Sequence, residues 1–183
     1  MKMFKKLMAV ALAGVMALAV LTGCGSTLNE KELIKQMNDQ LTISSMTNSS
    51  YKGFKEFKAD KEMDAKAETI AKKVAEKAKT QAEIETVLKS DEVKEIVLGK
   101  DDTNVYMISY VKSVSFGSKY YKTNKDMVDL SVMERNATSH YDSTALVGRE
   151  TKDAVVGVGF ADATVGDSVY TIVVMKVPTQ KKA

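Results

Sequence analysis

The sequence predicts an α+β domain, because helical and strand patterns occupy different parts of the chain. Between residues 28 and 98, hydrophobic residues recur at the three- and four-residue spacing of helices. From Asn104 onward, β-branched and aromatic residues fall on alternate positions, as in half-buried strands. One more helical pattern lies between the strand patterns. We therefore expect helices ahead of a small, mainly antiparallel sheet.

The N-terminal segment has the pattern of a secretory signal. Residues 1–6 are basic, residues 7–21 form an apolar run shorter than a bilayer span, and Leu21-Thr22-Gly23-Cys24 follows. With this ending the segment resembles a bacterial lipoprotein signal, which implies cleavage after residue 23 and diacylation of the Cys24 sulfur. We expect a signal peptide over 1–23, a lipidated tether over 24–27 and an extracytoplasmic protein anchored to the cell membrane through Cys24. The alternative is an ordinary secretory signal with a cysteine nearby.

Charge and residue counts exclude several classes of protein. The formal net charge of the chain is +3, and residues 1–23 contain three lysines and no acid, so the remainder is electrically neutral. Neutrality argues against a nucleic-acid partner. One Cys and one His exclude a Cys/His zinc site and a disulfide framework, and no Asp-x-Asp-x-Asp run is present to bind calcium. We expect no metal and no other cofactor.

Helices are predicted for most of the first half of a single domain that we place at residues 28–178. The first covers 28–46, and the second runs from Asp60, a natural N-cap, to about Lys79. Thr80 and Glu83 form a capping box for a third helix, and residues 90–98 add one or two turns that end at Gly99. Three aromatic residues recur at spacing three between the first two helices: Tyr51, Phe54 and Phe57.

The second half is predicted to contain three strands and one helix. A strand covers 105–116, a helix covers about 125–137, and two further strands cover 154–161 and 168–177. The short connection at 162–167 makes the last two an antiparallel hairpin. Pro178 lies just past the last strand, where no backbone donor is needed, and a basic tail follows at 179–183.

Five segments, in this order and spacing, resemble the SCP/CAP superfamily of cysteine-rich secretory, antigen 5 and pathogenesis-related proteins. They are the first helix with Asn38, the helix entry Phe57–Ala67, the helix and turn from Met127 to His140, the strand Val156-Gly-Val-Gly159-Phe-Ala161 and its partner Val169–Met175. The resemblance covers nearly all of residues 28–177. It implies a three-layer α-β-α sandwich.

The chain departs from that family at its metal-binding cleft. Family members with such a cleft use two histidines and two acids, whereas this chain has only His140. The Gly-Glu-Asn segment and tryptophan are absent, and Asn136-Ala-Thr-Ser139-His140 replaces the usual Ser-Pro-Gly-His turn. The resemblance therefore implies a divergent member that kept the scaffold and lost most of the cleft.

Two glycines in the predicted hairpin have two possible interpretations. The pattern Gly157-x-Gly159-x-x-Asp162 is similar to a dinucleotide-binding loop, but the third glycine is missing and strands flank it on both sides. We instead expect these glycines to let a neighbouring element approach the strand closely. No nucleotide is expected.

His140 and Glu134 are the candidate catalytic residues, and with Tyr141 they are the candidate ligand-binding residues. Glu134 lies near the end of the predicted helix and His140 just beyond it, so both could line one depression and act as an acid–base pair. The simpler interpretation, which we favour, is that a charged His140 caps the C-terminus of that helix. His140→Ala should then change stability little.

Two functions remain open from the sequence. The first is a non-enzymatic binding or interaction module with an envelope lipid, peptide or protein as partner. The second is a weak hydrolase of envelope material that uses His140 and Glu134. The lack of a complete catalytic set favours the binding module.

Overall fold

The computed structural model describes residues 30–47, 49–100, 102–113 and 130–182. Its helices are α2 (Glu30–Thr47), the 3-10 helix η1 (Ser49–Tyr51), α3 (Lys61–Lys77), α4 (Gln81–Leu88), α5 (Asp91–Val97) and α6 (Leu130–Arg135). Its strands are β1 (Phe54–Ala59), β2 (Asn104–Ser113), β3 (Thr138–His140), β4 (Arg149–Glu150), β5 (Ala154–Val165), β6 (Ser168–Pro178) and β7 (Gln180–Lys181).

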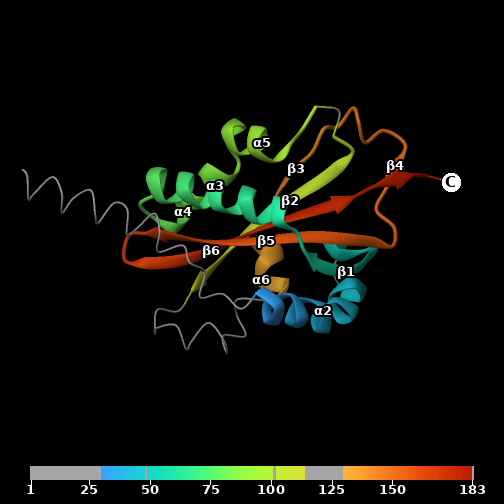
Figure 1. Cartoon of the computed structure of the whole chain (residues 1–183), viewed down its shortest axis with the longest axis horizontal. Coiled ribbons are helices and arrows are strands. Elements are labelled where there is room, and N and C mark those ends of the chain that lie inside the picture. Colours follow the sequence, from blue (N-terminus) through green and yellow to red (C-terminus); the bar gives the residue numbers. More distant parts are fainter. Residues whose placement is uncertain (1–29, 48, 101, 114–129, 183) are drawn as a thin grey trace, which may run out of the picture.

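Five strands form one mixed sheet in the order β1-β5-β6-β2-β3. Only the β1–β5 pair is parallel; the β5–β6, β6–β2 and β2–β3 pairs are antiparallel. Helices α3, α4 and α5 lie on one face of the sheet, and α2 and α6 lie on the other (Figure 1). The α+β class is confirmed, and the helices on both faces give the molecule three layers.

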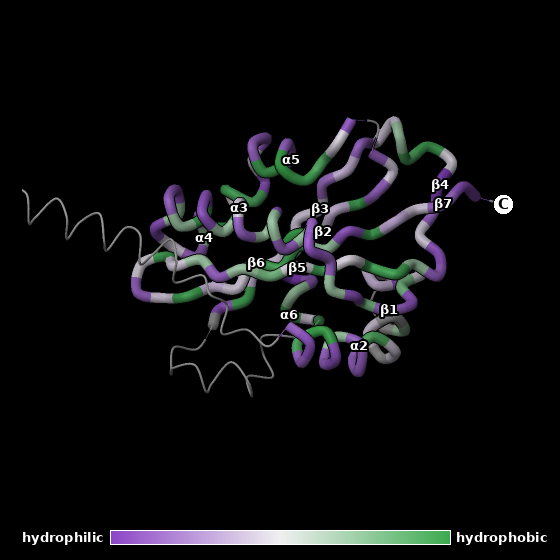
Figure 2. Tube along the Cα trace, viewed as in Figure 1, coloured by the Kyte–Doolittle hydropathy of each residue, from purple (hydrophilic) through white to green (hydrophobic). Residues whose placement is uncertain are grey.

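Each face of the sheet has its own hydrophobic core. One core joins α3, α4 and α5 to the side chains of Tyr106, Ile108 and Ile172. The other joins α2 and α6 to Met107, Val173 and neighbouring side chains. Successive residues of β2 and β6 belong to opposite cores because side chains alternate across a strand. The central strands β5 and β6 are accordingly hydrophobic along much of their length (Figure 2).

The helices in the first half begin where local rules predict. The side chain of Asp60 accepts hydrogen bonds from the backbone N–H groups of Glu62 and Met63 at the start of α3. The predicted capping box is present at Thr80, whose backbone N–H donates to the carboxylate of Glu83. Ser90 caps α5 in the same manner as Asp60 caps α3.

The order of elements differs from the prediction at β1. The segment with Tyr51, Phe54 and Phe57, to which the sequence pattern assigned no helix or strand, leads into strand β1, and this strand precedes α3 instead of following all the helices. The register of β1 shifts between Phe54 and Glu56, where β5 advances by one residue and β1 by two. This bulge places Phe54 and Phe57 on the same face, against the α2 core.

The predicted hairpin is confirmed and is longer than expected. Strand β5 continues through 162–165, a stretch predicted as a loop, and pairs with β6 up to Val165 and Ser168. The turn needs only Gly166 and Asp167. Gly166 has φ +58°, a left-handed conformation that glycine adopts without a Cβ penalty.

Residues 179–182 are not a simple tail. Strand β7 pairs with β4 in a second, two-stranded sheet, and the guanidinium of Arg149 donates to the hydroxyl and the carbonyl of Thr179. Several predicted features lie outside the described residues: the signal segment, the tether, residues 114–116 of the predicted strand and residues 125–129 of the predicted helix. None of the described helices is long and apolar enough to cross a membrane.

Candidate functional site

His140 lies in β3, opposite Tyr106 of β2, on the face that carries α4 and α5. Its side chain is only 6% exposed. The ring Nε2 lies 2.7 Å from the carbonyl oxygen of Leu88, the last residue of α4. Because a carbonyl can only accept, Nε2 carries the proton. Burial lowers the pKa of His140, so the ring is held in its neutral form.

The capping interpretation of His140 is therefore wrong about the helix, and burial lowers the pKa of the ring and so disfavours the charged form that this interpretation invoked. The residue is in a strand beyond α6, and it caps the C-terminus of α4, which lies far away in sequence. The expectation of a small effect for His140→Ala is revised as well, because the substitution would remove a buried hydrogen bond.

Glu134 lies on α6, on the opposite face of the sheet from His140. Its neighbours Leu130 and Met133 pack in the core beneath α2. The carboxylate of Glu134 accepts a hydrogen bond of 2.7 Å from the hydroxyl of Ser50, in η1. The structure thus separates Glu134 and His140 by the thickness of the sheet, and the depression that both were expected to line does not form.

Tyr141 follows β3 and is 48% exposed, while the adjacent His140 is buried. One side chain is buried and the other is half exposed, so the structure does not bring these two together around one ligand. Cys24 lies outside the described residues. Within the described part of the chain, no group of three or more His, Cys, Asp or Glu side chains could hold a metal ion.

The glycines of β5 have a structural explanation. The N-terminus of α3 packs directly on this strand: a Cβ atom on Gly159 would lie 2.1 Å from the backbone nitrogen of Asp64, and one on Gly157 would lie 2.5 Å from the carboxylate of Asp60. The backbone N–H of Phe160 donates to the carboxylate of Asp64, and the N–H of Asp60 to the carbonyl of Val158. The prediction of a close approach at these glycines is confirmed.

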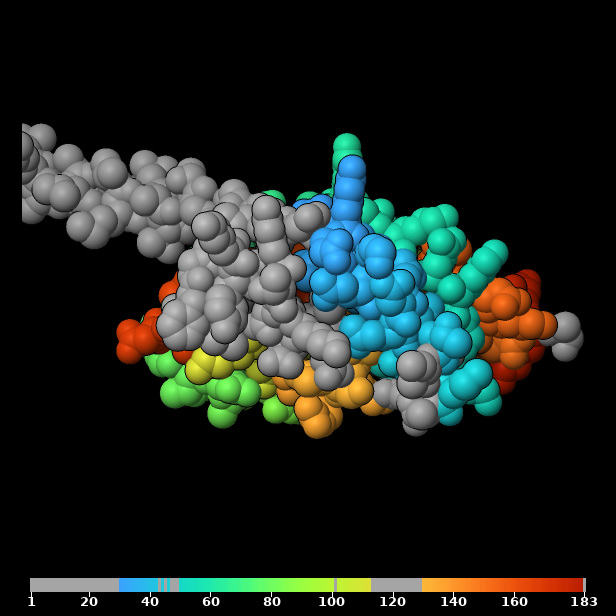
Figure 3. Space-filling view, turned by 90° about the horizontal axis from the view of Figure 1, so that it is seen from below, coloured from blue at the N-terminus to red at the C-terminus, as the bar shows by residue number. Residues whose placement is uncertain are grey.

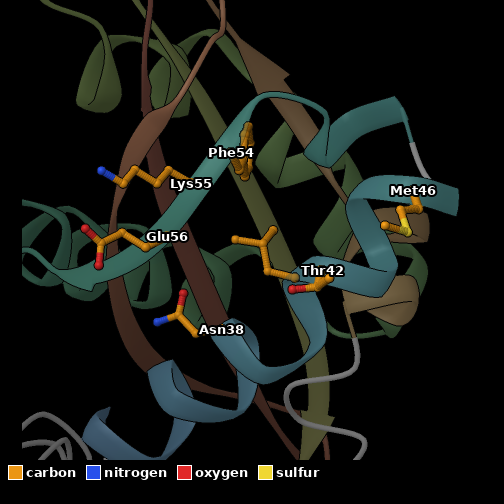
Figure 4. A pocket seen from close by; sticks show the side chains of 7 residues that line it. Asn38, Thr42, Met46, Phe54, Lys55 and Glu56 are labelled. Atoms are coloured by element: carbon orange, nitrogen blue, oxygen red, sulfur yellow. The ribbon is translucent and has the colours of Figure 1, made fainter.

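A hollow of about 470 Å³ opens between α2 and β1. Figure 4 shows that α2 contributes Asn38, Thr42 and Met46, and that β1 contributes Phe54, Lys55 and Glu56; Leu41 completes the lining. The side chain of Met46 is 82% exposed. Helix α2 itself lies on the surface of this face of the molecule (Figure 3).

A second hollow, of about 350 Å³, shares Phe54 with the first as a lining residue. Its lining combines three aliphatic side chains with polar and basic ones: Val105, Met107 and Val177, then Ser50, Thr151 and Lys52, in addition to Phe54. Because the two hollows share Phe54, we treat them as one groove, the α2–β1 groove. Both volumes fall within the range of ligand-binding sites.

Packing fixes the wall that divides the groove. The ring of Phe54 makes edge-to-face contacts with Tyr51 and Phe57, at centroid distances of 5.7 and 5.9 Å. Tyr51 is itself held by a hydrogen bond from its hydroxyl to the carbonyl of Leu130. The ring of Phe54, which lines both hollows, is therefore held in place by aromatic packing.

The groove is basic at both ends. Lys55 lines the first hollow and Lys52 the second, and both are exposed. Within the described residues neither lysine forms an ion pair. Glu56, the acid of the first hollow, pairs instead with Lys58, at 2.9 Å. Among the described residues, therefore, the groove presents two lysines that form no ion pair with an acid.

No protein-family model, no curated protein and no solved structure matches this chain.

The groove was missed from the sequence. Of the candidate residues only Glu134 lies near it, through its contact with Ser50. The signal that could have found the groove is the segment 51–57, in which three aromatic residues, Tyr51, Phe54 and Phe57, alternate with Lys52 and Lys55. Tyr51 and Phe57 themselves are buried in the core, and Phe54 alone of the three lines the hollows.

Proposed function

We propose that this protein is a bacterial lipoprotein, anchored to the outer face of the cell membrane through Cys24, whose domain binds a partner in the α2–β1 groove without catalysis. The observation that carries the proposal is the groove itself: two hollows of ligand-binding size on either side of a packed phenylalanine. The groove combines apolar walls with a few polar groups, as binding sites do.

The position of the groove supports an action close to the membrane. Five residues lie between Cys24 and Glu30, where α2 begins, and the six Cα–Cα steps from Cys24 to Glu30 span at most about 22 Å. Helix α2 also forms one wall of the groove. A lipidated Cys24 would therefore hold the groove near the bilayer and restrict the partners that can reach it.

A binding role agrees better with the geometry than hydrolysis does. Hydrolysis by His140 and Glu134 acting together would require them to approach one substrate, and they lie on opposite faces of the sheet. Both side chains also have structural hydrogen bonds, to Leu88 and Ser50. We therefore do not propose the hydrolase that the sequence left open.

We also propose that the domain is a divergent SCP/CAP-like fold. Three observations support this: three layers with a small, mainly antiparallel sheet, an asparagine of the first helix that holds a strand, and the Gly-Val-Gly strand against the long helix α3. An experimental structure tests it by superposition on an SCP/CAP domain. Agreement in the sheet alone, with both helical layers displaced, would contradict it.

Site-specific photo-crosslinking in intact cells tests the binding function. A benzophenone amino acid replaces Met46, which lines the groove, in the full-length chain. Val147 is the matched control because it is 79% exposed, against 82% for Met46, and does not line the groove. We expect illumination to give a discrete adduct at position 46 and none at 147.

The adduct should also disappear when Lys52 and Lys55 are both replaced by Glu. Equal labelling at 46 and 147, or no adduct at either position, would contradict a ligand in the groove. Mass spectrometry of the adduct reports whether the ligand is a peptide or a lipid.

A further inference from the structure

Resting on the proposed function, we infer that the ligand of the α2–β1 groove is an acidic peptide segment of a protein partner, which inserts two apolar side chains on either side of Phe54. The segment would be held by its side chains and not by pairing with the edge of the sheet. Three features of the groove lead to this chemistry.

The first feature is the division of the groove. Phe54 is a wall of both hollows and is fixed by its contacts with Tyr51 and Phe57. A divided groove offers two separate sites for apolar anchors, as peptide-binding grooves do. One continuous hydrocarbon chain would instead need an uninterrupted channel.

The second feature is the polarity of the lining. Asn38 and Thr42 line the first hollow, and Ser50 and Thr151 line the second, beside the apolar walls. Both hollows are open to solvent. Small lipids bind in enclosed, mostly apolar cavities, whereas mixed walls and an aromatic centre are typical of protein interfaces.

The third feature is charge. Lys52 and Lys55, one in each hollow, have no acidic partner among the described residues. A peptide with Asp or Glu beside its apolar anchors would supply that partner. Complementary charge of this kind increases the rate of association and suppresses basic competitors.

The edge of β1 is not available for strand addition, which excludes the commonest way in which an edge strand binds a peptide. The carboxamide of Asn38 already pairs with the backbone N–H and C=O of Phe57. The bulge between Phe54 and Glu56 interrupts the remaining edge. Recognition therefore depends on side chains, and Met46, flexible and exposed, can adapt to them.

A displayed library of random twelve-residue peptides tests the inference. The full chain, reconstituted in nanodiscs of phosphatidylcholine, is the target for selection. We expect enriched peptides to contain at least two acidic residues and two large apolar ones. A synthetic peptide of the enriched sequence should bind about tenfold more weakly to the Lys52→Glu/Lys55→Glu variant and to Met46→Glu.

A matched variant controls for net charge. Lys72→Glu/Lys79→Glu makes the same change of charge at two exposed lysines of α3 and its C-terminal flank, and it should bind the peptide as the natural chain does. Equal losses in both double variants would show general charge attraction and would overturn the inference. Enrichment of neutral or basic peptides would also overturn it.

The lipid alternative is tested with the same variants. The chain in nanodiscs that contain phosphatidylglycerol is compared with the chain in pure phosphatidylcholine, and protection of Met46 from oxidation reports occupancy of the groove. One result would overturn the inference of a peptide ligand: protection of Met46 that depends on phosphatidylglycerol and on Lys52 and Lys55, with no peptide enriched. The groove would then be a lipid-binding site. If position 46 forms an adduct in cells but the peptide selection fails, the groove binds a ligand and only the inference of an acidic peptide is rejected. If position 46 forms no adduct in cells, the proposed binding function itself is rejected.

Discussion

The carboxamide of Asn38 pairs with the backbone of Phe57 as a neighbouring strand would. Its Nδ2 donates to the carbonyl of Phe57 at 3.0 Å, and its Oδ1 accepts from the N–H of Phe57 at 2.8 Å. One side chain of α2 therefore closes the outer edge of β1 at a buried residue. The same contact fixes the separation of α2 and β1, and hence the width of the groove between them.

Asn38→Ala should lower the free energy of unfolding by about 1–3 kcal/mol, because it leaves a buried backbone donor and acceptor without partners. Urea denaturation of the full chain measures this. Asp39→Ala is the control: it removes an exposed contact with Lys35 in the same helix and should cost less than about 0.5 kcal/mol. Equal costs for the two variants would contradict the role of Asn38.

Gly159→Ala should destabilise the protein by about 3 kcal/mol or more, since the new Cβ would collide with the backbone of Met63 and Asp64. Backbone atoms in the first turn of a helix cannot move aside as a flexible side chain can. Gly99→Ala is the matched control, because its nearest atom would be 3.8 Å away. Thermal unfolding compares them; a tolerated Gly159→Ala would contradict the close packing of α3 on β5.

Thr138→Val should raise the free energy of unfolding by about 1 kcal/mol. Its hydroxyl is buried and has no hydrogen-bond partner among the described residues. Replacing the hydroxyl with a methyl group of the same shape therefore removes the free-energy penalty of burying an unsatisfied polar group. Thr171→Val should have the opposite effect, because the Thr171 hydroxyl donates to the carboxylate of Asp162 at 2.8 Å. Denaturation of both variants at pH 7 gives the comparison, and a shift of the same sign in both would contradict this interpretation.

His140 should make the protein less stable as the pH falls below about 6.5. Burial lowers its pKa in the folded state, so the unfolded chain takes up a proton near pH 6.5 and the folded chain only at a lower pH. The stabilisation is complete above pH 6.5 and is lost as the pH falls toward the lowered pKa, by up to about 1.4 kcal/mol per unit.

The comparison with His140→Gln isolates this contribution from that of the carboxylates. Urea denaturation of both chains between pH 7.5 and 5.0 should show the stability of the natural chain falling more steeply. Parallel curves would mean that His140 is accessible to protons in the folded state.

Cys24 should carry the lipid. Mass spectrometry of the membrane fraction is expected to show a chain that begins at Cys24 with a diacylated sulfur, and Cys24→Ser should leave no lipid on the protein. An unmodified N-terminus that still contains residues 1–23 would contradict the anchor and, with it, the position of the groove near the bilayer.

Local patterns predicted those parts of the fold that depend on neighbours in sequence. The caps at Asp60 and Thr80 and the hairpin at Gly166 were predicted because each needs only a few consecutive residues. Strand β1 was missed because its partner β5 lies about a hundred residues later and its bulge gives the aromatic residues a spacing that does not fit a regular strand.

The same difference between local and long-range features applies to the candidate site. The sequence by itself determined the main helices, the long strands β2, β5 and β6, and the close approach at Gly157 and Gly159; the short strands β3, β4 and β7 were missed. Only the tertiary structure decided that Glu134 and His140 lie on opposite faces and that α2 and β1 enclose a groove. The reason is physical: a helix cap or a turn is closed by bonds within a few residues, whereas a site forms where the sheet brings together side chains that no local interaction relates.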